Sequence, residues 1–143
     1  MGSFNGTLTN GPTWVTPGFP VDTAPAAPSG LTATSGDHQV ALTWIANGES
    51  DLAGYNVYRS TSTPVTKSSE KLNGTALVTS PAYTDTTGTV GTPYHYAVSA
   101  VDAAGNESDL SGEATGTPAT TPQTISFGPL ADKVLADSTA LTA

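Results

Sequence analysis

The chain has 143 residues, room for one ordinary domain, and its 12 acidic against 4 basic side chains give a formal charge of −8. So few and scattered basic residues exclude the positive cluster that holds a nucleic-acid backbone, and they disfavour an anionic membrane as a partner. Because cysteine is absent, disulfides, thiolate metal sites and a cysteine nucleophile are excluded as well. No apolar run approaches the roughly 18 residues of a membrane-spanning helix, and the start does not resemble a signal peptide.

Residues 1–26 show little hydrophobic periodicity and are rich in Gly, Pro and Thr. This composition predicts an extended arm or linker, or the remnant of a preceding domain. One short strand could form around Trp14 and Val15. Residues 25–28, Pro-Ala-Ala-Pro, indicate the entrance to a domain, because proline suits the first residues of a strand but cannot donate to a ladder.

Between residues 27 and 118, strand and turn signals alternate every 8–12 residues or so, which is typical of an all-β sandwich. Apolar side chains recur at every second position, the period of a strand with one face on a core. Strands are expected around residues 31–33, 40–45, 55–58, 72–78, 82–86, 94–101 and 110–116. The expected core consists of Leu31, Val40, Leu42, Trp44, Tyr55, Val57, Tyr83, Tyr94, Tyr96 and Val98.

Several stretches also carry a family resemblance in their order and spacing. They are PSGLTA (28–33), VALTW (40–44), DLAGYNVYR (51–59), YTDT (83–86) and YHYAVSAVD (94–102) leading into AGNES (104–108). Together they resemble a fibronectin type III module of a secreted bacterial multidomain protein. The resemblance implies a seven-stranded antiparallel, immunoglobulin-like β-sandwich over residues 27–118. It also implies that Trp44 fills the core and that Tyr94 forms a tyrosine corner, its hydroxyl bonding to backbone upstream.

The flanks resemble parts of other domains. Residues 119–143 begin as a Pro/Thr linker, and from residue 123 they resemble the opening of a bacterial Ig-like repeat that stops after its first strands. Residues 5–15 resemble a stretch of laminin-G-like jelly-roll domains. We expect residues 123–130, with Ile125 and Phe127, to dock as an added strand on this domain or on a neighbour.

The titratable residues give no pattern of a catalytic or metal site. His38 lies in a predicted turn, and His95 is expected to be exposed because it alternates with Tyr94 and Tyr96. The acidic stretch from residue 102 to 109 offers oxygen ligands to calcium but lacks the EF-hand spacing, so a hairpin turn is favoured there. Asp51 and Glu49 are expected to cap backbone amides. We therefore assign no catalytic, cofactor-binding or metal-ligating residue and no cofactor.

Enzyme motifs are absent from the sequence too. It has no GxSxG, P-loop or GxGxxG pattern, no Arg-Gly-Asp, and no pair of carboxylates that indicates a glycosidase. Asn-Gly pairs such as Asn73-Gly74 are turn signals. Trp14 and Tyr58 are the only aromatic residues expected to be free to stack on a sugar.

The expected function is that of a non-catalytic spacer or interaction module in a secreted or cell-surface bacterial protein, such as a polysaccharide-degrading enzyme or an adhesin. Its expected partners are neighbouring domains of the same chain. Two alternatives stay open at this point. One is a carbohydrate-binding accessory module, and the other is a subunit that self-assembles by strand addition through its arms.

Overall fold

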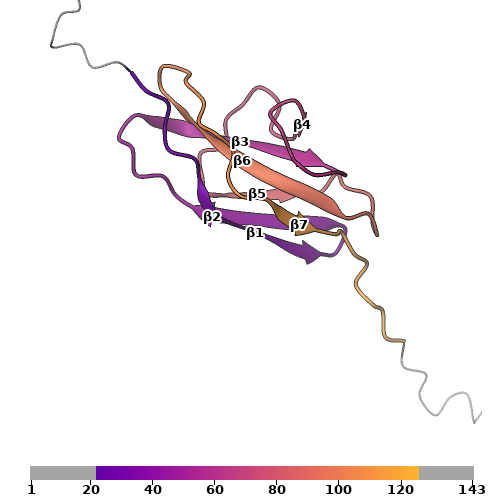
Figure 1. The fold of residues 1–143 in the computed structure, drawn as a ribbon. Coiled ribbons are helices and arrows are strands. Elements are labelled where there is room, and N and C mark those ends of the chain that lie inside the picture. Colours follow the sequence, from indigo (N-terminus) through magenta and orange to yellow (C-terminus); the bar gives the residue numbers. More distant parts are fainter. Residues whose placement is uncertain (1–21, 126–143) are drawn as a thin grey trace, which may run out of the picture.

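The computed structural model describes residues 22–125 and shows seven strands there (Figure 1). They are β1 (Ser29–Gly36), β2 (Gln39–Ile45), β3 (Leu52–Ser60), β4 (Glu70–Lys71), β5 (Ala82–Asp85), β6 (Tyr94–Asp102) and β7 (Ala114–Gly116). This part of the chain holds no helix that is long and apolar enough to cross a membrane. The expectations for Trp14 and for the jelly-roll stretch lie outside the described residues. The Ig-like repeat and its docking strand lie outside them beyond Ile125.

The strands form two antiparallel sheets that face each other (Figure 1). One sheet has the order β1-β2-β5, and the other has the order β4-β3-β6-β7. The longest pairing joins β3 to β6, from Leu52 opposite Asp102 to Ser60 opposite His95. The expected seven-stranded antiparallel sandwich is confirmed.

The core lies between the sheets and contains every residue expected there. Eight of the ten are buried, and Leu31 and Tyr83 are partly buried against the same cluster. Trp44 meets Tyr55 edge to face, with ring centroids 5.1 Å apart and planes at 74°. This geometry is the favoured one for aromatic pairs. All ten expected residues therefore lie in the core, and Ala100 of β6 joins them as a buried residue that was not on the expected list.

The outer face of the second sheet is covered, which corrects two expectations of exposure. Tyr58 is only 4 % exposed and packs with Val65 and Ala97 in a second apolar cluster. Its hydroxyl donates to Glu107 Oε1 over 2.7 Å. His95 is half-buried, with Nδ1 2.9 Å from Thr115 Oγ1 on β7. Alternation placed both side chains on the correct face, but loops fold over that face.

The expected strand around residues 72–78 is replaced by a turn. Strand β4 ends at Lys71, and beyond it only Val78 pairs with β3, in a single bridge to Tyr55. Between them the side chain of Asn73 replaces the backbone carbonyl of a paired strand, because its Oδ1 accepts a hydrogen bond from Val57 N over 2.9 Å. Gly74 follows in the left-handed region with φ +58°, which ends any extended run.

Two serines complete the edge of β6 where β7 does not reach. Strand β7 pairs only with residues 94–96, so it is shorter than the expected 110–116. Ser111 N donates to Val98 O, and Val98 N donates back to Ser111 Oγ over 3.0 Å. Ser108 bonds Ala100 in the same way, through its own N–H and its Oγ. These hydroxyls stand in for the backbone carbonyls of a paired strand and leave no buried amide of Val98 or Ala100 unbonded.

A buried ion pair joins the two sheets at the end where β6 begins. Arg59 Nη1 on β3 donates to Asp85 Oδ2 on β5 over 2.8 Å, with both side chains less than a tenth exposed. Asp85 also accepts from the Tyr96 hydroxyl and from Thr87. The guanidinium lies over the Tyr94 ring, 4.6 Å from its centroid. Each charge is thus paired and hydrogen-bonded, as burial requires.

The tyrosine corner that the family resemblance implies is confirmed by the hydroxyl of Tyr94. This hydroxyl accepts a hydrogen bond of 3.1 Å from Thr89 N, five positions upstream in the turn before β6. The bond from Thr89 N holds the pKa of Tyr94 below its usual value. The corner fixes the turn against the start of β6.

Replacing Trp44 by alanine should lower the free energy of unfolding by about 3–5 kcal/mol, because the change leaves a cavity in the core between the two sheets. Urea unfolding followed by circular dichroism measures this loss. Ile45→Ala is the matched control, since that side chain is 63 % exposed. A loss under about 1 kcal/mol for Trp44→Ala would contradict its place in the core.

Ser108→Ala should lower the free energy of unfolding by about 1–3 kcal/mol, because it leaves the buried Ala100 N–H without an acceptor. Ser50→Ala, at an exposed loop position, serves as the control and should change little. The Ala100 amide should also exchange its hydrogen faster. If both variants unfold at the same urea concentration, Ser108 does not complete the edge of β6.

Asp85→Asn should cost about 3–5 kcal/mol at neutral pH, because it leaves the buried Arg59 charge unpaired. Burial alone would raise the pKa of Asp85, but hydrogen bonds from Thr87, Arg59 and Tyr96 outweigh it and lower this pKa. The stabilisation is therefore present above the unfolded-state pKa of about 3.9 and is lost as the pH falls through the folded-state value. Urea unfolding at pH 7 and at lower pH should show the difference between variant and parent shrinking. An equal difference throughout would refute this assignment.

Candidate functional site

The N-terminal strap, residues 22–28, is held on the sandwich by side chains of the loop between β2 and β3. Ala26 N donates to Glu49 Oε1 over 2.7 Å, and Asn47 Nδ2 donates to Ala26 O over 2.8 Å. Asn47 N in turn donates to the hydroxyl of the core residue Tyr55 over 2.8 Å. The backbone N–H and C=O of Ala26 are thus both bonded to the β2–β3 loop, and that loop is bonded to the core through Tyr55.

Glu49 acts as the cap that the sequence predicted. The hydrogen bond from Ala26 N is the main reason that the pKa of Glu49 lies below its usual value. A carboxylate whose pKa is lowered by folding accepts its hydrogen bond at a pH above the pKa of the unfolded chain, and it loses this bond as the pH falls and the carboxylate is protonated. At neutral pH the contact to the strap is therefore fully formed.

The C-terminal strap, residues 117–121, is held at the hairpin between β1 and β2. Asp37 pairs with Ala119 as a parallel bridge, formed by His38 N donating to Ala119 O and Ala119 N donating to Gly36 O. Thr121 N donates to Asp37 Oδ1 over 3.0 Å, which is the main cause of a lowered pKa for Asp37. The segment predicted as the start of a free linker is thus bonded to the domain through Thr121.

The two straps lie at opposite ends of the sandwich (Figure 1). The N-terminal strap lies beside the loops that connect β2 to β3 and that follow β6, and the C-terminal strap lies at the other end, beside the β1–β2 hairpin. Neighbouring parts of a longer chain would therefore be attached at opposite ends of the sandwich.

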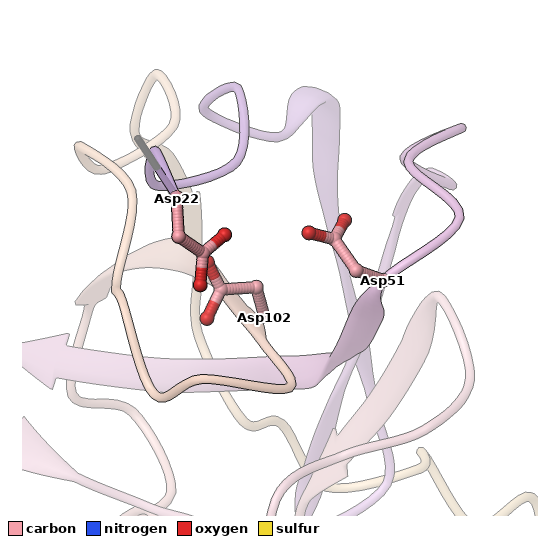
Figure 2. A group of neighbouring side chains, drawn as sticks. All are labelled: Asp22, Asp51 and Asp102. Carbon is pink, nitrogen blue, oxygen red and sulfur yellow. The ribbon is translucent and has the colours of Figure 1, made fainter. Parts of the chain in front are cut away.

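Three aspartates converge at the N-terminal end from separate parts of the chain (Figure 2). Asp22 belongs to the strap, Asp51 precedes β3 and Asp102 ends β6. One carboxylate oxygen from each lies within 4.8 Å of the others. Carboxylate oxygens are the donors that hard cations such as calcium prefer. These residues could offer three ligands, although exposed acidic groups often gather without an ion.

Asp102 is already engaged in the turn after β6. Its carboxylate accepts from Ala104 N, Asn106 N and Asn106 Nδ2 at 2.8–3.0 Å. Burial alone would raise the pKa of Asp102, but these bonds outweigh it, so the pKa lies below its usual value. The expected hairpin turn over 102–109 is therefore built around this carboxylate.

Glu107, another acid of the stretch 102–109, reaches over β3 and β6. Its Oε1 accepts from Ser99, from Tyr58 and from Asn56. Burial alone would raise its pKa, but these three bonds lower the pKa of Glu107 below the usual value. Burial and the bond to Glu107 raise the pKa of Tyr58 to about 12. The two loop acids thus serve separate structural contacts.

Sequence reasoning found part of the aspartate group and missed the rest. Asp102 was considered as a calcium ligand within the stretch 102–109, and Asp51 was expected to cap backbone amides in another loop. Asp22 was not considered, because it lies in a stretch without periodicity far from both in the sequence. Only the folding of the strap along this end of the sandwich brings the three together, and the sequence carries no local signal for that.

A shallow hollow of about 360 Å³ lies beside the N-terminal strap. Its lining includes the exposed side chain of Ile45 and the strap residues Ala26 and Ala27. Asn47 and Glu49, the residues that hold the strap, form part of the same wall.

Known proteins resemble this chain at the level of fold and sequence. An Fn3-like protein from Clostridium thermocellum of known crystal structure is 36 % identical, with a TM-score of 0.55, and the match covers 71 % of this chain and all of that one. An amylopullulanase of Thermoanaerobacterium thermosulfurigenes is 43 % identical over 98 residues, which is 68 % of this chain. Exoglucanase B of Cellulomonas fimi is 42 % identical over 109 residues, or 73 % of it.

The two enzymes are far longer than the region they share with this chain. The chain spans 5 % of the length of the amylopullulanase and 9 % of that of the exoglucanase. No family model matches the sequence. The relatives of this chain include segments of bacterial multidomain proteins. Because the match to the Fn3-like protein covers all of that protein at 36 % identity, this chain belongs to the fibronectin type III-like domains.

Proposed function

We propose that this chain works as a non-catalytic spacer that holds its neighbours in one parent chain at a fixed separation and direction. The observation that carries the proposal is the pair of straps. Both segments through which the chain enters and leaves are hydrogen-bonded to the sandwich, at opposite ends. A flexible linker would leave these backbone groups to water, whereas bonded straps transmit the orientation of the domain.

The use of the acidic and basic side chains supports a non-catalytic role. The buried charges Arg59 and Asp85 bind each other, and Glu107 accepts from three donors across the sheet. Catalytic groups are poised to titrate near the working pH, whereas the pKa of Asp85 and that of Glu107 are shifted down and away from it. These charges stabilise the fold.

The parent protein is proposed to be a secreted or cell-surface bacterial enzyme that degrades a polysaccharide. The support is the similarity to segments of an amylopullulanase and an exoglucanase, each much longer than this chain. The proposed partners are the neighbouring domains of that parent. The domain limits of 27 and 118 also remain proposals, and the strap contacts reach Ala26 on one side and Thr121 on the other.

A carbohydrate-binding role is the second candidate, and it needs an exposed aromatic platform. Within residues 22–125 the tyrosines and Trp44 are buried or, for Tyr83, half-buried in the core. Tyr58, expected to be free, is covered by the loop that carries Glu107. Trp14 and the self-assembling arm lie outside the described residues. The contacts of the described part therefore favour the spacer.

Residual dipolar couplings of the 143-residue chain test the spacer directly. The N–H couplings of Ala26 and Ala119 should fit the same alignment tensor as those of β3 and β6, because hydrogen bonds fix both straps to the domain. Couplings averaged towards zero at either residue would contradict the proposal. Affinity electrophoresis against a panel of polysaccharides separates the second candidate, since retardation by any of them would favour a binding module.

A further inference from the structure

Two Asn-Gly pairs lie in the described part of the chain, at residues 47–48 and 73–74. In such a pair the glycine has no side chain to keep its backbone nitrogen away from the carboxamide carbon of the asparagine. That nitrogen can attack the carbon, which is the first step of spontaneous deamidation. The two pairs have the same chemistry, so the surrounding structure decides which one reacts.

The side chain of Asn73 is bonded at both of its polar atoms. Its Oδ1 accepts from Val57 N, and its Nδ2 donates to Ala76 O over 2.6 Å and to Asn56 Oδ1 over 3.0 Å. Turning the carboxamide towards Gly74 would break all three contacts and leave Val57 N without its acceptor. The reaction is therefore opposed by the pairing of the sheet.

Asn47 is held much less tightly. Its Oδ1 has no hydrogen-bond partner among residues 22–125. Its Nδ2 makes one close bond, to Ala26 O, and a long contact of 3.4 Å to Glu49. Gly48 is exposed, and nothing lies within 4 Å of the place where its Cβ would be. One close bond to the strap and one long contact to Glu49 are the hydrogen bonds that oppose rotation of this carboxamide.

We propose that Asn47 is a site of spontaneous deamidation that releases the N-terminal strap. The backbone nitrogen of Gly48 loses its proton and bonds to Cγ of Asn47, and the Cγ–Nδ2 bond breaks. Nδ2 leaves as ammonia, taking up protons from water, and a five-membered succinimide remains. Water then opens the ring at either carbonyl, giving aspartate or isoaspartate at position 47. No oxidant, metal or enzyme takes part.

The product loses one of the two bonds that hold the strap at Ala26, and only the bond from Ala26 N to Glu49 is left. A carboxylate at position 47 has no N–H to donate to Ala26 O, and it adds a negative charge beside Glu49. Asp22, Asp51 and Asp102 already gather negative charge at this end of the sandwich. The C-terminal strap is untouched, because it is held at the other end of the sandwich by a backbone bridge and by Asp37. The consequence for the spacer rests on the proposed function, whereas the reaction at Asn47 does not.

Peptide mapping by mass spectrometry tests the reaction on the full chain. After incubation at 37 °C in mildly alkaline buffer, the peptide with Asn47 should convert several times faster than the peptide with Asn73. In urea, where the structure is lost, the two should convert at similar rates. Separate peptides distinguish the Asn-Gly pairs at 5–6 and 10–11. An equal or slower rate at Asn47 in the folded chain would overturn the assignment.

Amide hydrogen exchange of Asn47→Asp tests the release of the strap. Exchange at Ala26 should rise about tenfold or more, the factor that corresponds to losing one hydrogen bond of ordinary strength. Exchange in β3 and β6 should stay unchanged. Asp109→Asn, an exposed acid elsewhere in the chain, is the control for altered charge. Unchanged exchange at Ala26 would overturn the release, and averaged couplings in the unmodified chain would instead overturn the spacer.

Discussion

The ion pair of Arg59 with Asp85 sets the relation between the two sheets. Each residue belongs to a different sheet, and each is bonded by further side chains, so neither charge can leave the pair without losing several contacts. Apolar packing would tolerate sliding of one sheet over the other, because it is not directional. A buried guanidinium that donates to Asp85, Thr87 and Glu70 tolerates little displacement, because each charge-assisted hydrogen bond has its own direction. Tyr94, beneath the guanidinium, extends this fixed point to the turn before β6.

With the sheets fixed, their edges become the remaining problem, since an open edge invites pairing with another chain. In this domain polar side chains, in place of a neighbouring strand, hydrogen-bond much of the exposed strand edges. Asn73 bonds the edge of β3, Ser108 and Ser111 bond that of β6, and the C-terminal strap bonds the end of β1. The short β4 and β7 are consistent with this arrangement. Because side chains already occupy these strand edges, we expect the domain to contact its neighbours through the straps and not through its sheet edges.

The sequence predicted what depends on periodicity and missed what depends on loops. Every residue that alternation placed in the core lies there, because burial between two sheets has the period of the strand itself. Alternation also placed Tyr58 on the outer face. It could not predict that Tyr58 is buried there, because the loop that carries Glu107 and covers it has no periodic pattern. In the same way, Asp51 and Asp102 were visible as acids in turns, whereas their meeting with Asp22 depends on the path of the strap. The pairing of loops with one another leaves no regular pattern in a single sequence.

The two straps differ in how they are held, and this difference gives the domain a direction. At the C-terminal end backbone groups on both sides form a parallel bridge, and protonation of Asp37 would remove only the additional bond from Thr121 N. At the N-terminal end a carboxylate and a carboxamide hold one residue, Ala26, and both depend on the chemical state of their side chains. A fixed attachment is therefore built on one side and a conditional one on the other. Of the two neighbours in a parent chain, only the preceding one would gain freedom without unfolding of the sandwich.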